Sequence, residues 1–313
     1  MKIIIRVDAN QQIGTGHFFR CMTLGKKAIS RGHHVTFVSR YMPNDLVDIL
    51  NKNKITFKSI YFESESELDK LNHSHWLGTS QIEDAKSFIN CVDDKYDLLI
   101  IDNYGIDHIW ENKVSSICNK TLVIDDLADR QHKCDYLLDQ NLYKNPSSRY
   151  KKKLLGDTKT FFGPKFSILR DDFIYYRSKK HSTKKTVKRI FVFFGSIDLK
   201  NHTKVALDAI IKSELKNVSV DVVVGGQNPN KRFVEQICRD NNFNFYCQTS
   251  EIAKIMSQAN LAIGAGGSTS WERCCLGLPS IIIPIAQNQI EISKNLNESG
   301  AALKISRTKN LKN

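Results

Sequence analysis

Short apolar runs alternate with amphipathic stretches along the chain, a pattern typical of α/β proteins. The first half contains four apolar runs, which predict strands at 2–8, 34–39, 97–102 and 121–125. The last two are unbroken and bounded by acids, as expected for strands buried on both faces of a parallel sheet. The amphipathic stretch 17–30 predicts a helix that ends near Gly32.

The same alternation begins again after a lysine-rich segment. It predicts strands at 189–195, 218–226, 260–266 and 280–285, and helices near 202–212, 231–240, 250–258 and 268–276. We therefore predict two doubly wound, Rossmann-like α/β domains that face a cleft, with ligands at the carboxyl ends of the strands. The predicted boundaries are 1–162 for the N-terminal domain, 163–188 for a basic linker and 189–313 for the C-terminal domain.

Length and composition agree with two globular domains. The chain has 313 residues, of which 41% are hydrophobic and 25% charged, and this balance excludes a fully disordered chain. No apolar run approaches the roughly 18 residues of a membrane-spanning helix. The N-terminus reaches Arg6 and Asp8 too soon to hold the apolar core of a signal peptide. We expect a cytoplasmic protein, without membrane association, that acts as a monomer.

The net charge of +13 is concentrated in part between Arg177 and Arg189, where seven Lys or Arg residues occur without an acid. Such a cluster could bind nucleic acid or an acidic membrane surface, but a solvated linker is the simpler explanation. No set of aromatic residues for base stacking accompanies the cluster. We expect no stable nucleic acid partner, although a positive surface favours the approach of an anionic substrate.

The first strand is followed by a loop with Gly14 and Gly16, which lets the backbone approach a ligand beside the start of a helix. As a dinucleotide fingerprint the loop is weak, because Phe19 stands at the third glycine position and no acid follows the second strand. An NADP oxidoreductase is supported only by these glycines and Arg40.

His17 occupies the first turn of that helix. The positive end of the helix dipole disfavours imidazolium there, so His17 is a candidate neutral base that takes a proton from water. A capping or packing role is the alternative.

A second glycine loop, Gly264–Ser268, precedes a predicted helix that carries Glu272 in its first turn. Glycines and hydroxyls in this position suit a diphosphate, and Glu272 could accept two ribose hydroxyls. Alternatively, the loop is a tight turn and Glu272 compensates the helix dipole. A Walker A motif is absent, since no GK[ST] follows either loop.

The chain resembles the family of UDP-2,4-diacetamido-2,4,6-trideoxy-β-L-altropyranose hydrolases of pseudaminic acid biosynthesis. The matching motifs cover nearly the whole chain: RVDANQQIGTGHFFRC (6–21), IDNYGI (101–106), DDLADRQHKCDYLLDQN (125–141), FGPKFSILRDDF (162–173), FFGSIDLKN (193–201), GAGGSTSWE (264–272) and PIAQNQ (284–289). The resemblance implies a GT-B-like fold, shared with glycosyltransferases such as the lipid II enzyme. It also implies that a UDP-sugar substrate is cleaved to the free sugar and UDP.

The resemblance assigns roles to individual residues. His17 would activate water, and the sugar pocket would be formed by Tyr104, Gly14, Gly16 and Arg20. The ribose and diphosphate would be held by Glu272, Ser268 and Thr269, with further substrate contacts from Gln289 and Arg170.

Three features depart from the family pattern. Gly195-Ser196 replaces a pair of glycines, and Trp271 stands where some members carry a polar residue. The chain also stops soon after Ile305, where relatives usually continue into a helix, so we expect a short C-terminal end.

The chemistry needs few catalytic groups, because UDP leaves as a stabilised anion and requires little protonation. One base on the opposite face suffices, and direct attack of water at the anomeric carbon predicts inversion with C–O cleavage. We expect no metal and no cofactor. Asp125, Asp126, Asp129 and His132 could form a metal cluster. However, acids that cap turns at strand ends explain Asp125 and Asp126 more simply.

Two other functions stay open. A glycosyltransferase of the same fold would pass the sugar to an acceptor in place of water. A non-enzymatic nucleotide- or RNA-binding protein would use the basic stretch 177–189.

Overall fold

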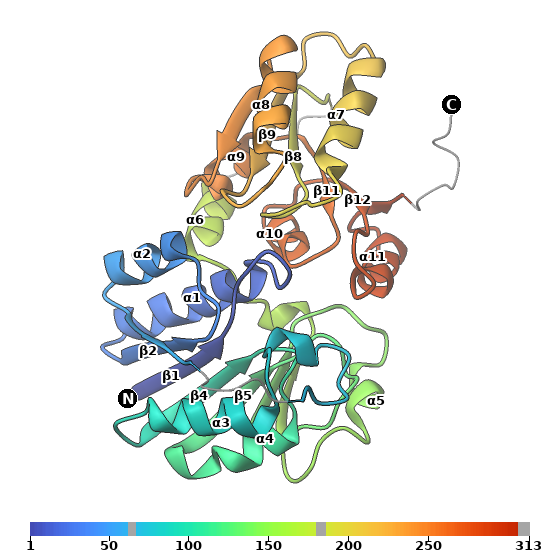
Figure 1. Cartoon of the computed structure of the whole chain (residues 1–313). Coiled ribbons are helices and arrows are strands. Elements are labelled where there is room, and N and C mark those ends of the chain that lie inside the picture. The colour runs from blue at the N-terminus through green and yellow to red at the C-terminus, as the bar shows by residue number, and fades with distance from the viewer. Residues whose placement is uncertain (62–66, 180–185, 306–313) are drawn as a thin grey trace. The chain divides into compact units, whose positions relative to one another are not determined.

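Two parallel sheets organise the chain in a computed structural model that describes residues 1–61, 67–179 and 186–305 (Figure 1). The chain divides into two units, Met1–Ile168 and Leu169–Asn313. Part of the predicted linker, 163–168, belongs to the first unit and the remainder to the second. Residues 180–185 of the basic stretch lie outside the described residues. No helix in the described part of the chain is long and apolar enough to cross a membrane.

The first unit contains a seven-stranded parallel sheet in the order β3-β2-β1-β4-β5-β6-β7. Its strands are β1 (Lys2–Val7), β2 (His34–Ser39), β3 (Thr56–Ser59), β4 (Tyr96–Asp102), β5 (Cys118–Ile124), β6 (Tyr136–Asp139) and β7 (Lys159–Phe162). The strand order reverses between β1 and β4, whose carboxyl ends therefore form the switch point at which such sheets bind ligands.

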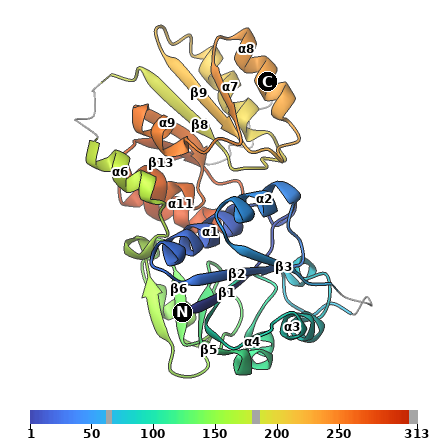
Figure 2. The ribbon, with the colours of Figure 1, turned by 90° about the vertical axis from the view of Figure 1, so that its left-hand side faces the viewer.

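Helices cover both faces of this sheet (Figure 2). They are α1 (Gly16–Ser30), α2 (Asn44–Lys52), α3 (Gln81–Asn90), α4 (His108–Lys113) and α5 (Pro146–Tyr150). On one face, Phe18 of α1 and Leu50 of α2 are fully buried against the strands. On the other face, Phe88 of α3 and Trp110 of α4 are fully buried. The continuous apolar strands are explained by this double coverage.

The second unit repeats the arrangement with six parallel strands in the order β10-β9-β8-β11-β12-β13. Its strands are β8 (Arg189–Phe193), β9 (Ser219–Val224), β10 (Asn244–Cys247), β11 (Leu261–Ala265), β12 (Ser280–Ile283) and β13 (Leu303–Lys304). Its helices are α6 (Asp171–Lys179), α7 (His202–Lys212), α8 (Lys231–Asp240), α9 (Ile252–Gln258), α10 (Thr269–Cys275) and α11 (Gln289–Glu298). The prediction of two Rossmann-like α/β domains is confirmed.

A fully buried arginine ties β1 to helix α3 in the first unit. Arg6 donates to Asp84 through Nη2 at 2.7 Å and through Nε at 3.2 Å, and its Nη1 lies 2.7 Å from Asp8. Trp110 Nε1 donates to the same Asp84 at 2.8 Å. Burial alone would lower the pKa of Arg6, but Asp8 and Asp84 raise it above its ordinary value. The charge is therefore kept, and it fixes the position of Asp8 just after β1.

The substitution Asp84→Ala should lower the free energy of unfolding by about 3–5 kcal/mol, because it leaves Nε and Nη2 of Arg6 and Nε1 of Trp110 buried without their acceptor. Urea denaturation measures the change. Asp93→Ala is the matched control, since Asp93 pairs with Lys58 while its side chain is 79% exposed, and such pairs contribute about 0–1 kcal/mol. Equal losses in the two variants would contradict this account of Arg6.

Candidate functional site

His17 lies at the start of α1 and is only 9% exposed. Its Nδ1 is 2.6 Å from Oδ1 of Asp102, the last residue of β4. An ionised carboxylate only accepts hydrogen bonds, so Nδ1 of a neutral His17 carries the proton and Nε2 is the basic nitrogen. Asp102 was not among the predicted site residues, although its place at a strand end beside the switch point is a usable signal.

Arg20, one turn further along α1, binds the same carboxylate of Asp102 through two of its nitrogens. Its Nε donates to Oδ2 at 2.5 Å and its Nη2 to Oδ1 at 2.6 Å, a bidentate pair. Burial would raise the pKa of Asp102, but Arg20 and then His17 bring it well below its ordinary value. Arg20 Nη1 also donates to Asp126 at 2.7 Å. The guanidinium therefore points into the protein, where it keeps Asp102 ionised.

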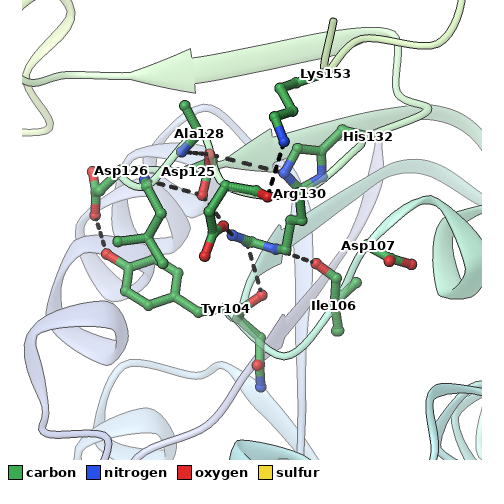
Figure 3. A network of polar contacts seen from close by, with 12 residues as sticks. Tyr104, Ile106, Asp107, Asp125, Asp126, Ala128, Arg130, His132 and Lys153 are labelled. Carbon is green, nitrogen blue, oxygen red and sulfur yellow. Dashed lines mark hydrogen bonds and ion pairs between the residues drawn. The ribbon is translucent and has the colours of Figure 1, made fainter. Parts of the chain in front are cut away.

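Tyr104 packs its ring edge-to-face against the His17 ring, with centroids 4.7 Å apart. Its hydroxyl donates to Asp126 Oδ2 at 2.5 Å (Figure 3). Burial and Asp126 raise the pKa of Tyr104 well above its ordinary value, so the hydroxyl stays protonated. Because that proton is already donated, Tyr104 offers its ring rather than its O–H group to a ligand.

Trp76 completes an aromatic surface around the histidine. It stacks on Tyr104 with centroids 4.9 Å apart and contacts His17 edge-on at 5.3 Å. His73 packs against both aromatic rings. Sequence reasoning missed Trp76 and His73, because they lie in a polar segment without helix or strand periodicity.

The acids considered as a metal cluster are engaged by other groups. Asp125 accepts from the backbone N–H groups of Leu127 and Ala128 and pairs with Arg130 at 3.0 Å (Figure 3). His132 Nδ1 lies 2.6 Å from Glu111 Oε1, so that ring is oriented by a different carboxylate. Asp125 therefore caps a turn, as expected for an acid at a strand end. In the described residues, no three His, Cys, Asp or Glu side chains are grouped to hold a metal ion.

The two glycines at the start of α1, Gly14 and Gly16, differ in backbone conformation. Gly14 has φ +83°, a left-handed conformation that favours glycine. Gly16 has no such φ, and a Cβ built on it would meet nothing within 4 Å. The open space next to Gly16 allows a ligand to approach the backbone closely there.

In the second unit, the loop Gly264–Ser268 is held by its neighbours. A Cβ on Gly264 would lie 2.2 Å from the Phe193 carbonyl oxygen, and one on Gly266 would lie 2.1 Å from Ser293 Oγ. Gln289 Oε1 accepts from the N–H groups of Gly266 and Ile285 at 3.2 and 3.1 Å. Gln289, predicted as a substrate contact, thus uses its carbonyl to position the loop.

Glu272 and Arg170 carry polar atoms without protein partners. The Glu272 carboxylate, in the first turn of α10 after Ser268 and Thr269, has no hydrogen bond or ion pair with any described residue. Burial raises its pKa to about 7, and Arg170 partly opposes that shift. Arg170 Nε and Nη2 are buried without a hydrogen bond, and Nη2 lies 3.5 Å from Asp172. Buried groups without hydrogen bonds require an explanation, and a ligand that bonds to them is one.

The loop at Gly195-Ser196 leads to the N-terminus of α7, whose first backbone N–H groups already bond to a side chain of the protein. Asp198 accepts from the N–H groups of His202 and Thr203, both at 2.8 Å, at the start of α7. It also accepts from Thr203 Oγ1 at 2.7 Å. The chain's own carboxylate therefore satisfies the donors that a phosphate would need there.

Comparison with known proteins agrees with this architecture. Residues 189–312 match the glycosyltransferase family 28 C-terminal domain. MurG of Acinetobacter baumannii has a TM-score of 0.58 at 15% identity, with 98% of this chain and 86% of MurG covered. TcCGT1, solved in complex with UDP, has a TM-score of 0.62 at 13% identity, with 97% and 85% covered. The chain thus has the GT-B-like fold of glycosyltransferases.

Three relatives place the sequence more closely. The UDP-2,4-diacetamido-2,4,6-trideoxy-β-L-altropyranose hydrolase of Campylobacter jejuni is 26% identical over 270 residues, 86% of each chain. This match confirms the resemblance expected from the motifs. An uncharacterised protein of Methanocaldococcus jannaschii is 24% identical over 303 residues. The match covers 93% of this chain but only 57% of the Methanocaldococcus protein. The spore coat polysaccharide biosynthesis protein SpsG of Bacillus subtilis is 30% identical over 150 residues, 47% of this chain and 44% of SpsG.

Proposed function

We propose that this protein is an enzyme that acts on a UDP-sugar. More specifically, we propose that it hydrolyses a UDP-activated 2,4-diacetamido-2,4,6-trideoxy sugar to the free sugar and UDP. The observation that carries the proposal is the 2.6 Å contact between His17 and Asp102, which leaves Nε2 as a base beside an aromatic surface. The activity named for the C. jejuni relative supports the choice of substrate class.

In the proposed reaction, His17 Nε2 takes a proton from water while the water oxygen bonds to the anomeric carbon. The bond from that carbon to the diphosphate oxygen breaks, and UDP leaves with the electron pair. The imidazolium that forms is stabilised by Asp102, which Arg20 keeps ionised. A single displacement inverts the anomeric configuration. A positioned base contributes roughly 10²–10⁴ to the rate.

The nucleotide half of the substrate suits the second unit. Glu272 would accept the ribose hydroxyls, and Arg170, whose buried Nε and Nη2 make no hydrogen bond although Nη2 lies 3.5 Å from Asp172, would be a further donor. Loop N–H groups and the hydroxyls of Ser268 and Thr269 would donate hydrogen bonds to the diphosphate oxygens. Stabilisation of that charge replaces the general acid that glycosidases require for an alcohol leaving group.

The sugar half suits the aromatic surface near His17. Trp76 and Tyr104 present stacked rings, and the Tyr104 hydroxyl is engaged by Asp126. Apolar faces favour the methyl groups of acetamido and 6-deoxy substituents over free hydroxyls, whose burial without a partner is costly. The surface therefore favours a deoxy, acetamido sugar.

His17→Ala should lower turnover of the UDP-sugar by at least about 100-fold while UDP affinity is unchanged, since only the base is lost. Asp102→Asn should also lower turnover, because an amide no longer holds the required tautomer. Free UDP is followed by NMR and UDP affinity by calorimetry. His34→Ala, at an exposed position on β2, is the control. Wild-type turnover in His17→Ala would remove the histidine from the mechanism.

Glu272→Ala should weaken UDP binding, because two ribose hydroxyls lose their acceptor. Calorimetry with UDP measures the loss, which should be on the order of tenfold for a charged hydrogen-bond acceptor. Glu251→Ala is the control, since Glu251 is exposed and pairs with Lys254 at the surface. Unchanged affinity in Glu272→Ala would exclude the ribose role.

We propose that the reaction needs no metal ion, since charge on the diphosphate is met by the protein's own donors. Turnover should be the same after dialysis against EDTA and after addition of magnesium or manganese ions. Loss of turnover in EDTA, with recovery in a divalent ion, would contradict the proposed mechanism.

A glycosyltransferase remains the second candidate, and the family 28 domain match over 189–312 favours it. The two functions differ in whether UDP release requires an acceptor. UDP release from the purified protein and UDP-sugar alone supports hydrolysis, whereas release only with an added acceptor supports transfer.

A further inference from the structure

Arg273 is a buried cation without a carboxylate partner. It lies in α10, and its side chain is 1% exposed. Its Nη2 donates to the Ala265 carbonyl oxygen at 2.7 Å and to Ser270 Oγ at 2.9 Å. Its Nε and Nη1 are buried and have no hydrogen-bond acceptor, and no acid among the described residues forms an ion pair with it.

This arrangement is unlike the buried arginines of the first unit. Arg6, Arg20 and Arg130 each contact two carboxylates. Burial lowers the pKa of Arg273 to about 10, and the charges of Cys274 and Glu272 oppose that shift without cancelling it. The guanidinium is therefore still charged at neutral pH, and no carboxylate of the described residues forms an ion pair with it. An uncompensated buried charge is costly, so an anion close to it would be stabilised.

The charge lies directly behind the loop Gly264–Ser268. A Cβ built on Gly264 would be 2.8 Å from Arg273 Nη1, so only glycine allows the guanidinium to approach the loop backbone. The hydrogen bond to Ala265 joins it to the end of β11. An anion seated on this loop would face the guanidinium across the thickness of one backbone segment.

We propose that Arg273 provides the positive charge that the diphosphate of the bound nucleotide neutralises, and so selects nucleoside diphosphates over monophosphates. The inference rests on the proposed function in assigning the diphosphate to this loop. Arg273 is a positioning residue, because it acts through the loop backbone, to which its Nη2 is bonded at Ala265.

The test compares the affinities of the full chain for UDP, UMP and uridine by calorimetry. Arg273→Gln should lose on the order of tenfold in UDP affinity, as expected for one charge acting over several ångström at intermediate dielectric. It should lose less for UMP and nothing for uridine. Arg273→Lys keeps the charge but not the full set of hydrogen bonds, and should retain the preference for UDP over UMP.

The matched control is Arg239→Gln, which removes one positive charge from an arginine of the same unit whose side chain is 70% exposed. It should change the three affinities little. Equal losses of affinity for UDP, UMP and uridine in Arg273→Gln would mean that Arg273 only supports the structure of the loop, and would overturn the inference. Loss of the preference for UDP over UMP in Arg273→Lys would do the same. If Arg273→Gln does not fold, as judged by circular dichroism, Arg273→Lys decides the question alone.

A panel of ADP, GDP, CDP and UDP separates this inference from the proposed function. Binding of a different nucleoside diphosphate with the same dependence on Arg273 would support the inference and contradict the choice of UDP. UDP binding that is unchanged in Arg273→Gln would overturn only the inference. Failure of the wild-type chain to bind any of the four would overturn both.

Discussion

The arrangement of the first unit depends on one buried carboxylate, Asp102, held between Arg20 and His17. The bidentate contact from Arg20 offsets the cost of burying the charge, and the charge in turn orients the imidazole. Because both partners of Asp102 come from the first two turns of α1, the position of that helix against β4 and the tautomer of His17 are set by the same interaction. Protonation of Asp102 would loosen both together, and its strongly lowered pKa protects against this.

The two units differ in how the buried charges near their candidate site residues are paired. In the first, acids at strand ends are matched by buried arginines, so Asp8, Asp102 and Asp125 are all paired. In the second, Arg273 forms no ion pair among the described residues, its Nε and Nη1 are buried without a hydrogen bond, and it interacts with Glu272 only through the longer-range attraction of their charges. Paired charges leave little net field for an anion, as the proposed sugar site requires, whereas a buried cation without an ion pair would be stabilised by a bound anion. This difference argues for the proposed division of substrate recognition more strongly than either glycine loop does.

Sequence patterns predicted eight of the strands, together with α1 in the first unit and α7 to α10 in the second, because these are long or periodic. They missed the short buried strand β6 and the helices α2 to α6 and α11. They also missed edge strands such as β3 and β7, whose four residues are only partly buried and carry little periodicity. His17 could be predicted because glycines and a helix start flank it. Asp102 could not be paired with it, since that requires knowing that β1 and β4 are neighbours in the sheet. The inward direction of Arg20 likewise depends on carboxylates contributed by distant strands.

Asp198 at the start of α7 has a wider consequence. Each unit places a helix after its first strand, and in many Rossmann-like domains that helix end receives the phosphates. Here the second unit supplies an internal counterion to its own helix, with two N–H groups and one hydroxyl already taken. A phosphate arriving at α7 would have to displace a covalently tethered competitor at very high effective concentration. In the proposed function, the start of α7 would therefore compete poorly for the nucleotide, and the placement of the ligand would be restricted by a site that is already occupied.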